Sequence, residues 1–264
     1  MDIALRHRVN AARVAIQQQT DFFREQLGQV ASQWKADDTR VTFADFAISE
    51  KIFTELRRSF PDDQLFPEES GPLDEIVPIE SRYTWVLDPI DGTNNYALGL
   101  SNCAISLALL KQGHPVYGLI YDGSTDQLIE GGPGQAILVN GRKHQPASKE
   151  ESEGNEIVAL HFPLPEHRAA QLAPLLETTR VRSLGSAALH LTYVALGRLD
   201  GVLDEGIRIW DIAAAVALLK AGGYSISFLS ANPFPVESFT RQGPKIRYVA
   251  GSESFIRRIQ NWLG

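Results

Sequence analysis

The stretch Trp85-Val86-Leu87-Asp88-Pro89-Ile90-Asp91-Gly92-Thr93 joins a short apolar run to two carboxylates three residues apart. Pro89 has no N–H group to donate to a sheet, so we expect a strand over this run to end near Asp88. Gly92 and Thr93 then allow a helix to begin, and the first N–H groups of a helix can bind an anion. The stretch therefore places ligands for a hard cation beside a site for a phosphate group, although such a string alone is more typical of a plain turn.

Two further acidic positions fit the same site. Glu68 and Glu69 follow Phe66-Pro67, and adjacent side chains of an extended segment point in different directions, so one of the two acids can face a metal. Asp211 lies just before an alanine-rich run, where a helix is expected to begin. Singly, these acids are typical of a solvated surface and of a helix cap. Together with the first two, they predict a carboxylate cluster.

Composition places the chain among ordinary globular proteins. It has 264 residues, of which 44% are hydrophobic and 22% are charged. A formal charge of −7 offers no general electrostatic footprint for nucleic acid or an anionic membrane surface, so neither partner is expected. The single Cys103 excludes an internal disulfide and is expected in the core. The first 30 residues lack the basic segment followed by an apolar segment that is typical of a signal peptide, which predicts a cytoplasmic protein.

The hydrophobic periodicity predicts a mixture of helices and strands. Helices are expected over residues 3–27, 44–59, 166–176, 187–196, 211–221 and 255–263. Strands are expected over residues 83–87, 104–110, 116–121, 135–139, 157–160, 180–184, 201–203 and 225–229, with those of the first half forming an antiparallel meander. A polar stretch near residues 140–154 predicts a boundary between a unit of residues 1–145 and a unit of residues 146–264.

The motifs, taken in order, resemble the inositol monophosphatase family of magnesium-dependent, lithium-sensitive phosphatases. The segments that carry the resemblance are Lys-Ala-Asp-Asp-Thr-Arg-Val-Thr-Phe-Ala-Asp at 35–45, Pro-Glu-Glu-Ser at 67–70, Asp-Pro-Ile-Asp-Gly-Thr-Asn-Asn-Tyr at 88–96, Arg-Ser-Leu-Gly-Ser-Ala-Ala at 182–188, Gly-Arg-Leu-Asp-Gly at 197–201 and Trp-Asp-Ile-Ala-Ala-Ala at 210–215. The resemblance spans nearly the whole chain. It implies an α+β fold of the layered αβαβα type, with the metal-binding motifs in the first unit, the rest of the metal and substrate site in the second, and a homodimer.

The resemblance also implies a set of metal ligands for two or three Mg²⁺ ions. One ion would be held by Glu68, Asp88 and the backbone carbonyl of Ile90, and a second by Asp88, Asp91 and Asp211. Ligation by oxygen alone favours magnesium over zinc, and the six histidines show no close metal-binding spacing. Of these histidines, His161 and His167 are expected to be solvated or structural.

Catalytic roles follow from the same resemblance. Glu68 and Thr93 would polarise a metal-bound water for in-line attack on phosphorus, and Asp45 would orient the Thr93 hydroxyl. The amides of Gly92 and Thr93 would bind the phosphate oxygens. Lys35 lies in a segment that resembles the family's mobile catalytic loop, but an exposed lysine is an equally good interpretation.

Specificity would come from the groups around the leaving alcohol. By resemblance, Asp91 and Asp204 accept hydrogen bonds from substrate hydroxyls. The opposite wall would be lined by Gly185, Ser186 and Ala187. The family commonly has Glu where this chain has Asp204, so this contact is expected to weaken or to pass to Glu205.

These features predict a phosphatase for myo-inositol 1-phosphate or a similar small polyol or sugar phosphate. Histidinol-phosphate, fructose-1,6-bisphosphate and 3′-phosphoadenosine phosphatase activities remain open within the same chemistry. A polar or acidic lining near residues 185–188 would indicate the first, and an adenine pocket the last; neither is visible in the sequence. A regulatory binding protein that retains the fold is the alternative from another class, and the intact ligand set disfavours it.

Overall fold

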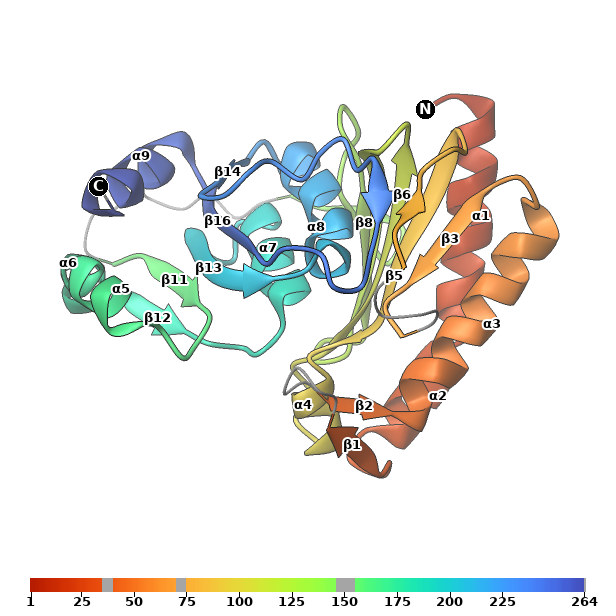
Figure 1. Ribbon diagram of the computed structural model, residues 1–264, viewed down its shortest axis with the longest axis horizontal. Helices are drawn as coiled ribbons and strands as arrows, with labels where there is room; N and C mark the ends of the chain where they lie inside the picture. Colours follow the sequence, from red (N-terminus) through yellow and green to blue (C-terminus); the bar gives the residue numbers. More distant parts are fainter. Residues whose placement is uncertain (35–39, 70–74, 146–154, 264) are drawn as a thin grey trace.

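Helices and sheets alternate in five layers across the molecule, as the computed structural model shows (Figure 1). The structure describes residues 1–34, 40–69, 75–145 and 155–263. The expected αβαβα arrangement is confirmed. The N-terminus lies by the outer helices of one side and the C-terminus by those of the other.

The first two layers are built from the N-terminal half. The outer helices are α1 (Ile3–Gln17), α2 (Thr20–Gln26) and α3 (Phe43–Ser59). They cover a seven-stranded sheet with the order β10 (Arg142–Lys143), β9 (Leu138–Val139), β8 (Gln127–Gly131), β7 (His114–Asp122), β6 (Ala104–Lys111), β5 (Tyr83–Asp91) and β3 (Gln64–Pro67). Beside it, β1 (Ser32–Trp34) pairs with β2 (Arg40–Thr42). The single helix expected over residues 3–27 is wrong, because the chain breaks it at Gln18 and Gln19.

The other three layers come from the C-terminal half. Two central helices, α7 (Ala187–Ala195) and α8 (Ile209–Gly222), lie between the sheets (Figure 1). The second sheet has the order β12 (Arg180–Arg182), β11 (Ile157–Leu160), β13 (Gly201–Ile207), β16 (Ile246–Gly251) and β14 (Ser225–Phe228). The last layer contains α5 (Glu166–Gln171), α6 (Ala173–Thr178) and α9 (Glu253–Leu263). The strands β12, β11 and β13 run parallel, so their carboxyl ends meet at one edge of the sheet.

Three hydrophobic clusters fill the spaces between the layers. Along β5, Trp85 and Leu87 pack toward α1 and α3, while Val86 packs toward α8 on the opposite face. Both faces of this strand are therefore buried. The core between the sheets draws on both halves of the chain, and a short pairing of β4 (Val77–Pro78) with β15 (Ser238–Phe239) also links them. The division at residues 145 and 146 stays a prediction.

The strand β5 does not end at Asp88, so that expectation is wrong. It continues through Pro89 to Asp91, and its pairing with β6 shifts in register between the two aspartates. An irregularity of this kind tolerates the missing N–H group of proline. The antiparallel meander predicted for the first half is incomplete. The strand β3 joins β5 in parallel, and β8 was not expected. The strand expected over 135–139 is reduced to β9 (Leu138–Val139), and β16 was missed.

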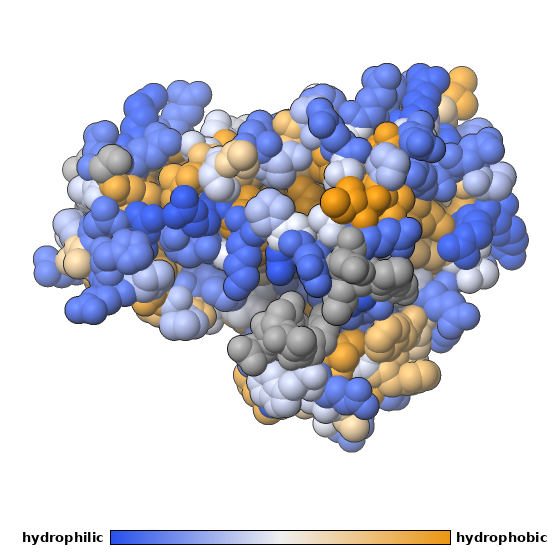
Figure 2. Space-filling view, viewed as in Figure 1, coloured by the Kyte–Doolittle hydropathy of each residue, from blue (hydrophilic) through white to orange (hydrophobic). Residues whose placement is uncertain are grey.

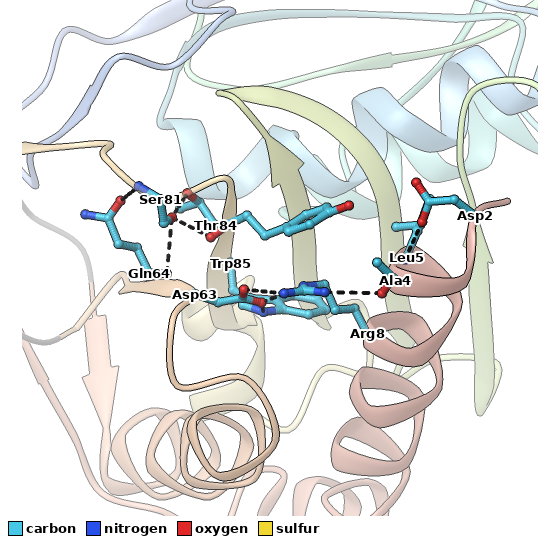
Figure 3. A network of polar contacts seen from close by, with 10 residues as sticks. Asp2, Ala4, Leu5, Arg8, Asp63, Gln64, Ser81, Thr84 and Trp85 are labelled. Carbon is cyan, nitrogen blue, oxygen red and sulfur yellow. Dashed lines mark hydrogen bonds and ion pairs between the residues drawn. The ribbon is translucent and has the colours of Figure 1, made fainter.

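A polar network ties the first helix to the first sheet (Figure 3). The Arg8 guanidinium donates two hydrogen bonds to the Asp63 carboxylate, at 2.7 and 2.8 Å. The indole N–H of Trp85 donates to the same carboxylate at 3.0 Å. Asp63 therefore joins α1, the turn before β3, and β5 through one buried group.

Hydrophobic residues also reach the surface between the hydrophilic ends of the molecule (Figure 2). Near β2 and the start of α3, Phe43 and Phe46 are exposed. In the described part of the chain, no helix has the length and apolar character needed to cross a membrane.

Candidate active site

The end of β5 and the start of α4 (Thr93–Ala97) form the centre of the candidate site. Asp88 and Asp91 are buried, with 2% and 8% of their surface exposed. The Ile90 N–H donates to Asp88 Oδ1 at 3.0 Å and fixes that carboxylate. Gly92 adopts a left-handed conformation with φ +88°, and α4 begins at Thr93 as the sequence predicts.

The helix α8 brings a third carboxylate to this loop. Asp211 lies in the first turn of α8, and its Oδ2 accepts a hydrogen bond of 2.6 Å from the Arg208 N–H. One carboxylate oxygen each of Asp88, Asp91 and Asp211 lies within 4.8 Å of the other two. Segments more than a hundred residues apart thus meet in one cluster between the two sheets.

The electrostatics of this cluster fit a bound cation. Desolvation and the charge of Glu68 raise the pKa of Asp88 well above its usual value. Desolvation and the charge of Asp91 do the same to the pKa of Asp211. Burial raises the pKa of Asp91 to about 6, against the opposing effect of hydrogen bonds from Ser186 and Ala188. Within the described residues, no lysine or arginine forms an ion pair with these three aspartates. An all-oxygen site of this charge suits a divalent ion such as Mg²⁺.

The two adjacent glutamates turn in different directions, as their extended segment predicts. The Glu68 N–H donates to the Leu87 carbonyl at 3.1 Å, which extends the pairing of β3 with β5. Its side chain is close enough to Asp88 to affect that group's pKa. Glu69 is buried, and its carboxylate lies 3.7 Å from the Arg241 guanidinium.

Thr93 and Asp45 lie side by side although 48 residues separate them. The Thr93 hydroxyl donates to the Ile90 carbonyl at 2.8 Å and lies 3.4 Å from Asp45 Oδ1. Asp45 is buried in the first turn of α3, where its Oδ2 accepts hydrogen bonds of 2.7 Å from the N–H and the hydroxyl of Thr42. Asp45 thus lies beside Thr93, and its role in orienting the Thr93 hydroxyl stays a prediction. Lys35 lies outside the described residues.

The loop after β12 packs directly on the acidic cluster. Asp91 Oδ2 accepts hydrogen bonds from the Ser186 hydroxyl at 2.5 Å and from the Ala188 N–H at 2.6 Å. Gly185 lies against Gly92, where an added Cβ on Gly92 would approach the Gly185 carbonyl oxygen to 3.1 Å. The Ser186 hydroxyl is therefore directed at Asp91, and the predicted substrate contacts of Gly185, Ser186 and Ala187 stay predictions.

Two residues that hold this loop were missed in the sequence. The Asn95 amide donates hydrogen bonds of 2.7 Å to the carbonyls of Asn102 and Leu184. The Leu184 N–H donates to His190 Nε2 at 2.9 Å. Burial lowers the pKa of His190 to about 3, so its ring is neutral and can accept this bond. No local pattern in the sequence points to either contact.

Asp204, on β13, is the second residue that was predicted to bind substrate hydroxyls. It is fully buried, its Oδ1 accepts a hydrogen bond of 3.2 Å from the Gly206 N–H, and burial raises its pKa to about 6. The neighbouring Glu205 forms ion pairs with Arg168 at 2.6 Å and Arg247 at 3.9 Å. The expectation that a substrate contact passes to Glu205 is therefore not supported.

Comparison with known proteins gives a consistent result. The profile of the inositol monophosphatase family matches residues 3–259. A protein named Nus factor SuhB from Xylella fastidiosa is 36% identical over 192 residues, which cover 70% of this chain and 68% of that protein. The Nus factor SuhB of Escherichia coli K12 is 32% identical over 207 residues, or 75% of each chain.

Solved structures show the same likeness. The extragenic suppressor protein suhB from Bartonella henselae superimposes with a TM-score of 0.76 at 27% identity, covering 96% of this chain and 94% of that one. The inositol monophosphatase from Anabaena gives a TM-score of 0.69 at 32% identity, covering 83% and 85%. The resemblance drawn from the motifs is confirmed.

Proposed function

Because the chain belongs to the inositol monophosphatase family, we propose that it is a Mg²⁺-dependent phosphomonoesterase acting on myo-inositol 1-phosphate or a similar small polyol or sugar phosphate. The observation that carries this proposal is the meeting of the Asp88, Asp91 and Asp211 oxygens within 4.8 Å of one another. Carboxylates that repel each other in this way are typical of a site completed by divalent ions.

The ligands of the proposed site are all oxygen atoms. Glu68, Asp88, the Ile90 carbonyl, Asp91 and Asp211 would hold two or three Mg²⁺ ions. When bound, Mg²⁺ would neutralise phosphate charge and activate water for attack. The Ile90 carbonyl accepts a hydrogen bond from the Thr93 hydroxyl, and a carbonyl oxygen has a second lone pair that can bind a metal.

The remaining residues of the site would orient the reacting groups. Glu68 and the Thr93 Oγ1 atom would each accept a hydrogen bond from the attacking water and so polarise it, with Thr93 held between Asp45 and the Ile90 carbonyl. The N–H groups of Gly92 and Thr93 begin α4 and would bind phosphate oxygens. On the substrate side, Asp91 would accept a hydrogen bond from the alcohol part of the ester. Asp204 and the loop of Gly185, Ser186 and Ala187 would form the walls around that part.

A regulatory role is the second candidate function. It is favoured by the name Nus factor SuhB, which several relatives carry and which is not an enzyme name. For this reason the absence of a nucleic-acid partner stays a prediction. The homodimer, the absence of a membrane partner and inhibition by lithium are also predictions that no observation tests. The alternative phosphatase substrates also remain open.

A panel of phosphate esters, assayed with and without Mg²⁺, tests the proposed function. We expect Mg²⁺-dependent release of phosphate, fastest from small polyol or sugar phosphates. Asp91→Asn should lower kcat by about 100-fold or more, because the amide cannot supply the negative charge that binds Mg²⁺. Its oxygen can still accept the bonds from Ser186 and Ala188, so the fold should be retained by circular dichroism.

The control for this variant is Asp126→Asn, which makes the same change at an exposed position. It should turn over substrate like the unmodified protein. Normal activity in Asp91→Asn would contradict the assignment of the site. If no ester is hydrolysed with Mg²⁺, the phosphatase proposal fails and the regulatory role becomes the better interpretation.

A further inference from the structure

His161 lies at the edge of the second sheet where the candidate substrate wall is built. It directly follows β11, which is the strand between β12 and β13. The last paired residues of β11 and β13 are Leu160 and Leu203, so His161 and Asp204 come one step further along the same edge. The chain after β12 supplies Gly185. His161 therefore lies between the two parts of the proposed wall, at the carboxyl ends of parallel strands, where ligands bind in open α/β sheets.

The imidazole of His161 turns Nδ1 toward Asp204, and the side chain is partly exposed. Its Nδ1 lies 3.7 Å from Asp204 Oδ2, within ion-pair range but beyond a hydrogen bond. Both atoms are buried and have no hydrogen-bond partner among the described residues. The His161 side chain as a whole is 44% exposed, whereas that of Asp204 is fully buried. The face of this pair that a ligand can reach therefore belongs to His161.

The position of the Asp204 carboxylate favours one tautomer of the His161 ring. A carboxylate can only accept hydrogen bonds, so it favours the tautomer with the proton on the nitrogen that faces it. In the neutral form of that tautomer, Nε2 is the acceptor of the ring. Asp204 is fully buried, with Oδ1 accepting from Gly206 and Oδ2 facing the imidazole, so a substrate that approaches this pair meets His161 first.

We infer that His161 recognises the substrate by accepting a hydrogen bond from one of its hydroxyl groups at Nε2, and that Asp204 is a positioning residue that acts through His161. This inference rests on the proposed phosphatase function and narrows the substrates to polyhydroxylated monophosphates. The acids that surround the wall, Asp91 and Asp204, disfavour a second phosphate group there. A hydroxyl group, in contrast, can donate a hydrogen bond to Nε2.

A comparison of two substrates isolates the proposed contact. p-Nitrophenyl phosphate has the phosphate ester but no hydroxyl group, whereas myo-inositol 1-phosphate has both. In His161→Phe, KM for the inositol ester should rise about threefold to tenfold with little change in kcat, while the aryl ester is unaffected. His161→Gln should recover part of the loss, since its amide oxygen can accept a hydrogen bond near the position of Nε2. His167→Phe is the matched control, because this histidine lies six residues away and is exposed.

A double-mutant cycle tests whether Asp204 acts through His161. Asp204→Asn should raise KM for the inositol ester without affecting the aryl ester, and adding His161→Phe should cause no further loss. Additive effects of the two changes would show that Asp204 contacts substrate independently and would overturn the inference. Equal losses on both esters would assign His161 a structural role and would also overturn it.

A binding measurement separates this inference from the proposed function. Protein labelled with ¹⁵N-histidine is titrated with myo-inositol in the presence of Mg²⁺ and inorganic phosphate, so no turnover is needed. We expect a shift of the His161 Nε2 resonance in the unmodified protein and none at His167. A shift without hydrolysis of any ester would support the recognition site while rejecting the phosphatase. Hydrolysis without a shift would reject the role of His161 alone.

Discussion

Gly92 lies where the loop of acidic residues meets the substrate wall. Its φ of +88° belongs to the left-handed region, and an added Cβ would lie 2.9 Å from the Asn102 carbonyl oxygen and 3.1 Å from that of Gly185. Gly92→Ala should therefore lower the free energy of unfolding by about 2–4 kcal/mol, from backbone strain and overpacking together. Activity should fall more than tenfold, because Asp91 and Thr93 flank the displaced residue. Denaturant unfolding and the Mg²⁺-dependent assay measure the two effects.

Gly134→Ala separates the two causes. Gly134 has a similar φ of +72°, but an added Cβ there meets nothing within 4 Å. This variant should lose only the part due to backbone strain and should keep full activity. If both variants lose the same stability and activity, close packing at Gly92 does not hold the site together.

The acidic residues proposed as metal ligands could be found in the sequence because they lie at local signals. Asp88 and Asp91 end an apolar run, and Asp211 begins an alanine-rich helix. Asn95 and His161 have no such signal, since their roles depend on residues that pair only in the folded chain. Asn95 contacts a residue 89 positions away, and His161 meets Asp204 only through the pairing of β11 with β13. His161 was expected to be solvated or structural for this reason.

Local rules also located most helices and strands but not their pairing. The expected helix over 44–59 is confirmed by α3, whereas β5 passes the proline that was expected to end it. That expectation assumed that every residue of a strand must donate its N–H group to the neighbouring strand. Pro89 needs no such donor, because the pairing of β5 with β6 shifts in register between Asp88 and Asp91. The parallel partner β3 was missed because its four residues show no clear alternation.

The junction of α1, β3 and β5 depends on Asp63. Its carboxylate accepts hydrogen bonds from Arg8 and from the Trp85 indole, and only 3% of its side chain is exposed. Asp63→Ala should lower the free energy of unfolding by about 2–3 kcal/mol, because both donors are left without their acceptor. Thermal unfolding measures the loss. Asp62→Ala changes an adjacent exposed carboxylate and should have little effect, so similar losses in both variants would reject this role for Asp63.

At the scale of the whole molecule, the site exists because the layers enclose it. The core between the sheets contains residues of β5, α7, α8 and β13, and the acidic cluster lies where β5 and α8 meet the loop after β12. Periodicity predicted which segments are helices and strands, but the order of layers came from the resemblance to a family. Contacts between residues more than a hundred positions apart leave no local pattern, and they decide this arrangement.

The buried acids should make the stability of the whole molecule depend on pH and, through the proposed metal site, on Mg²⁺. Burial raises the pKa of Asp91 to about 6, above the usual aspartate value of 3.8, so the folded state binds more protons than the unfolded state. For such a group the stability is fully present below pH 4 and is lost as the pH rises through 6. Mg²⁺ should replace the lost protons, because it binds the ionised carboxylates and only in the folded state.

We therefore expect Mg²⁺ to raise Tm more at pH 8 than at pH 5. At a concentration about 100 times its Kd, the ion adds about 2.7 kcal/mol, which corresponds to about 5–10 °C for a chain of this size. At pH 5 protons compete for the acids, and the shift should be less than half as large. Differential scanning fluorimetry with and without MgCl₂ measures both shifts, with NaCl of equal ionic strength as the control for screening. The Asp91→Asn variant should lose most of the shift at pH 8. Equal shifts at the two pH values, or an undiminished shift in that variant, would show that Mg²⁺ stabilises the protein at some other place than this cluster.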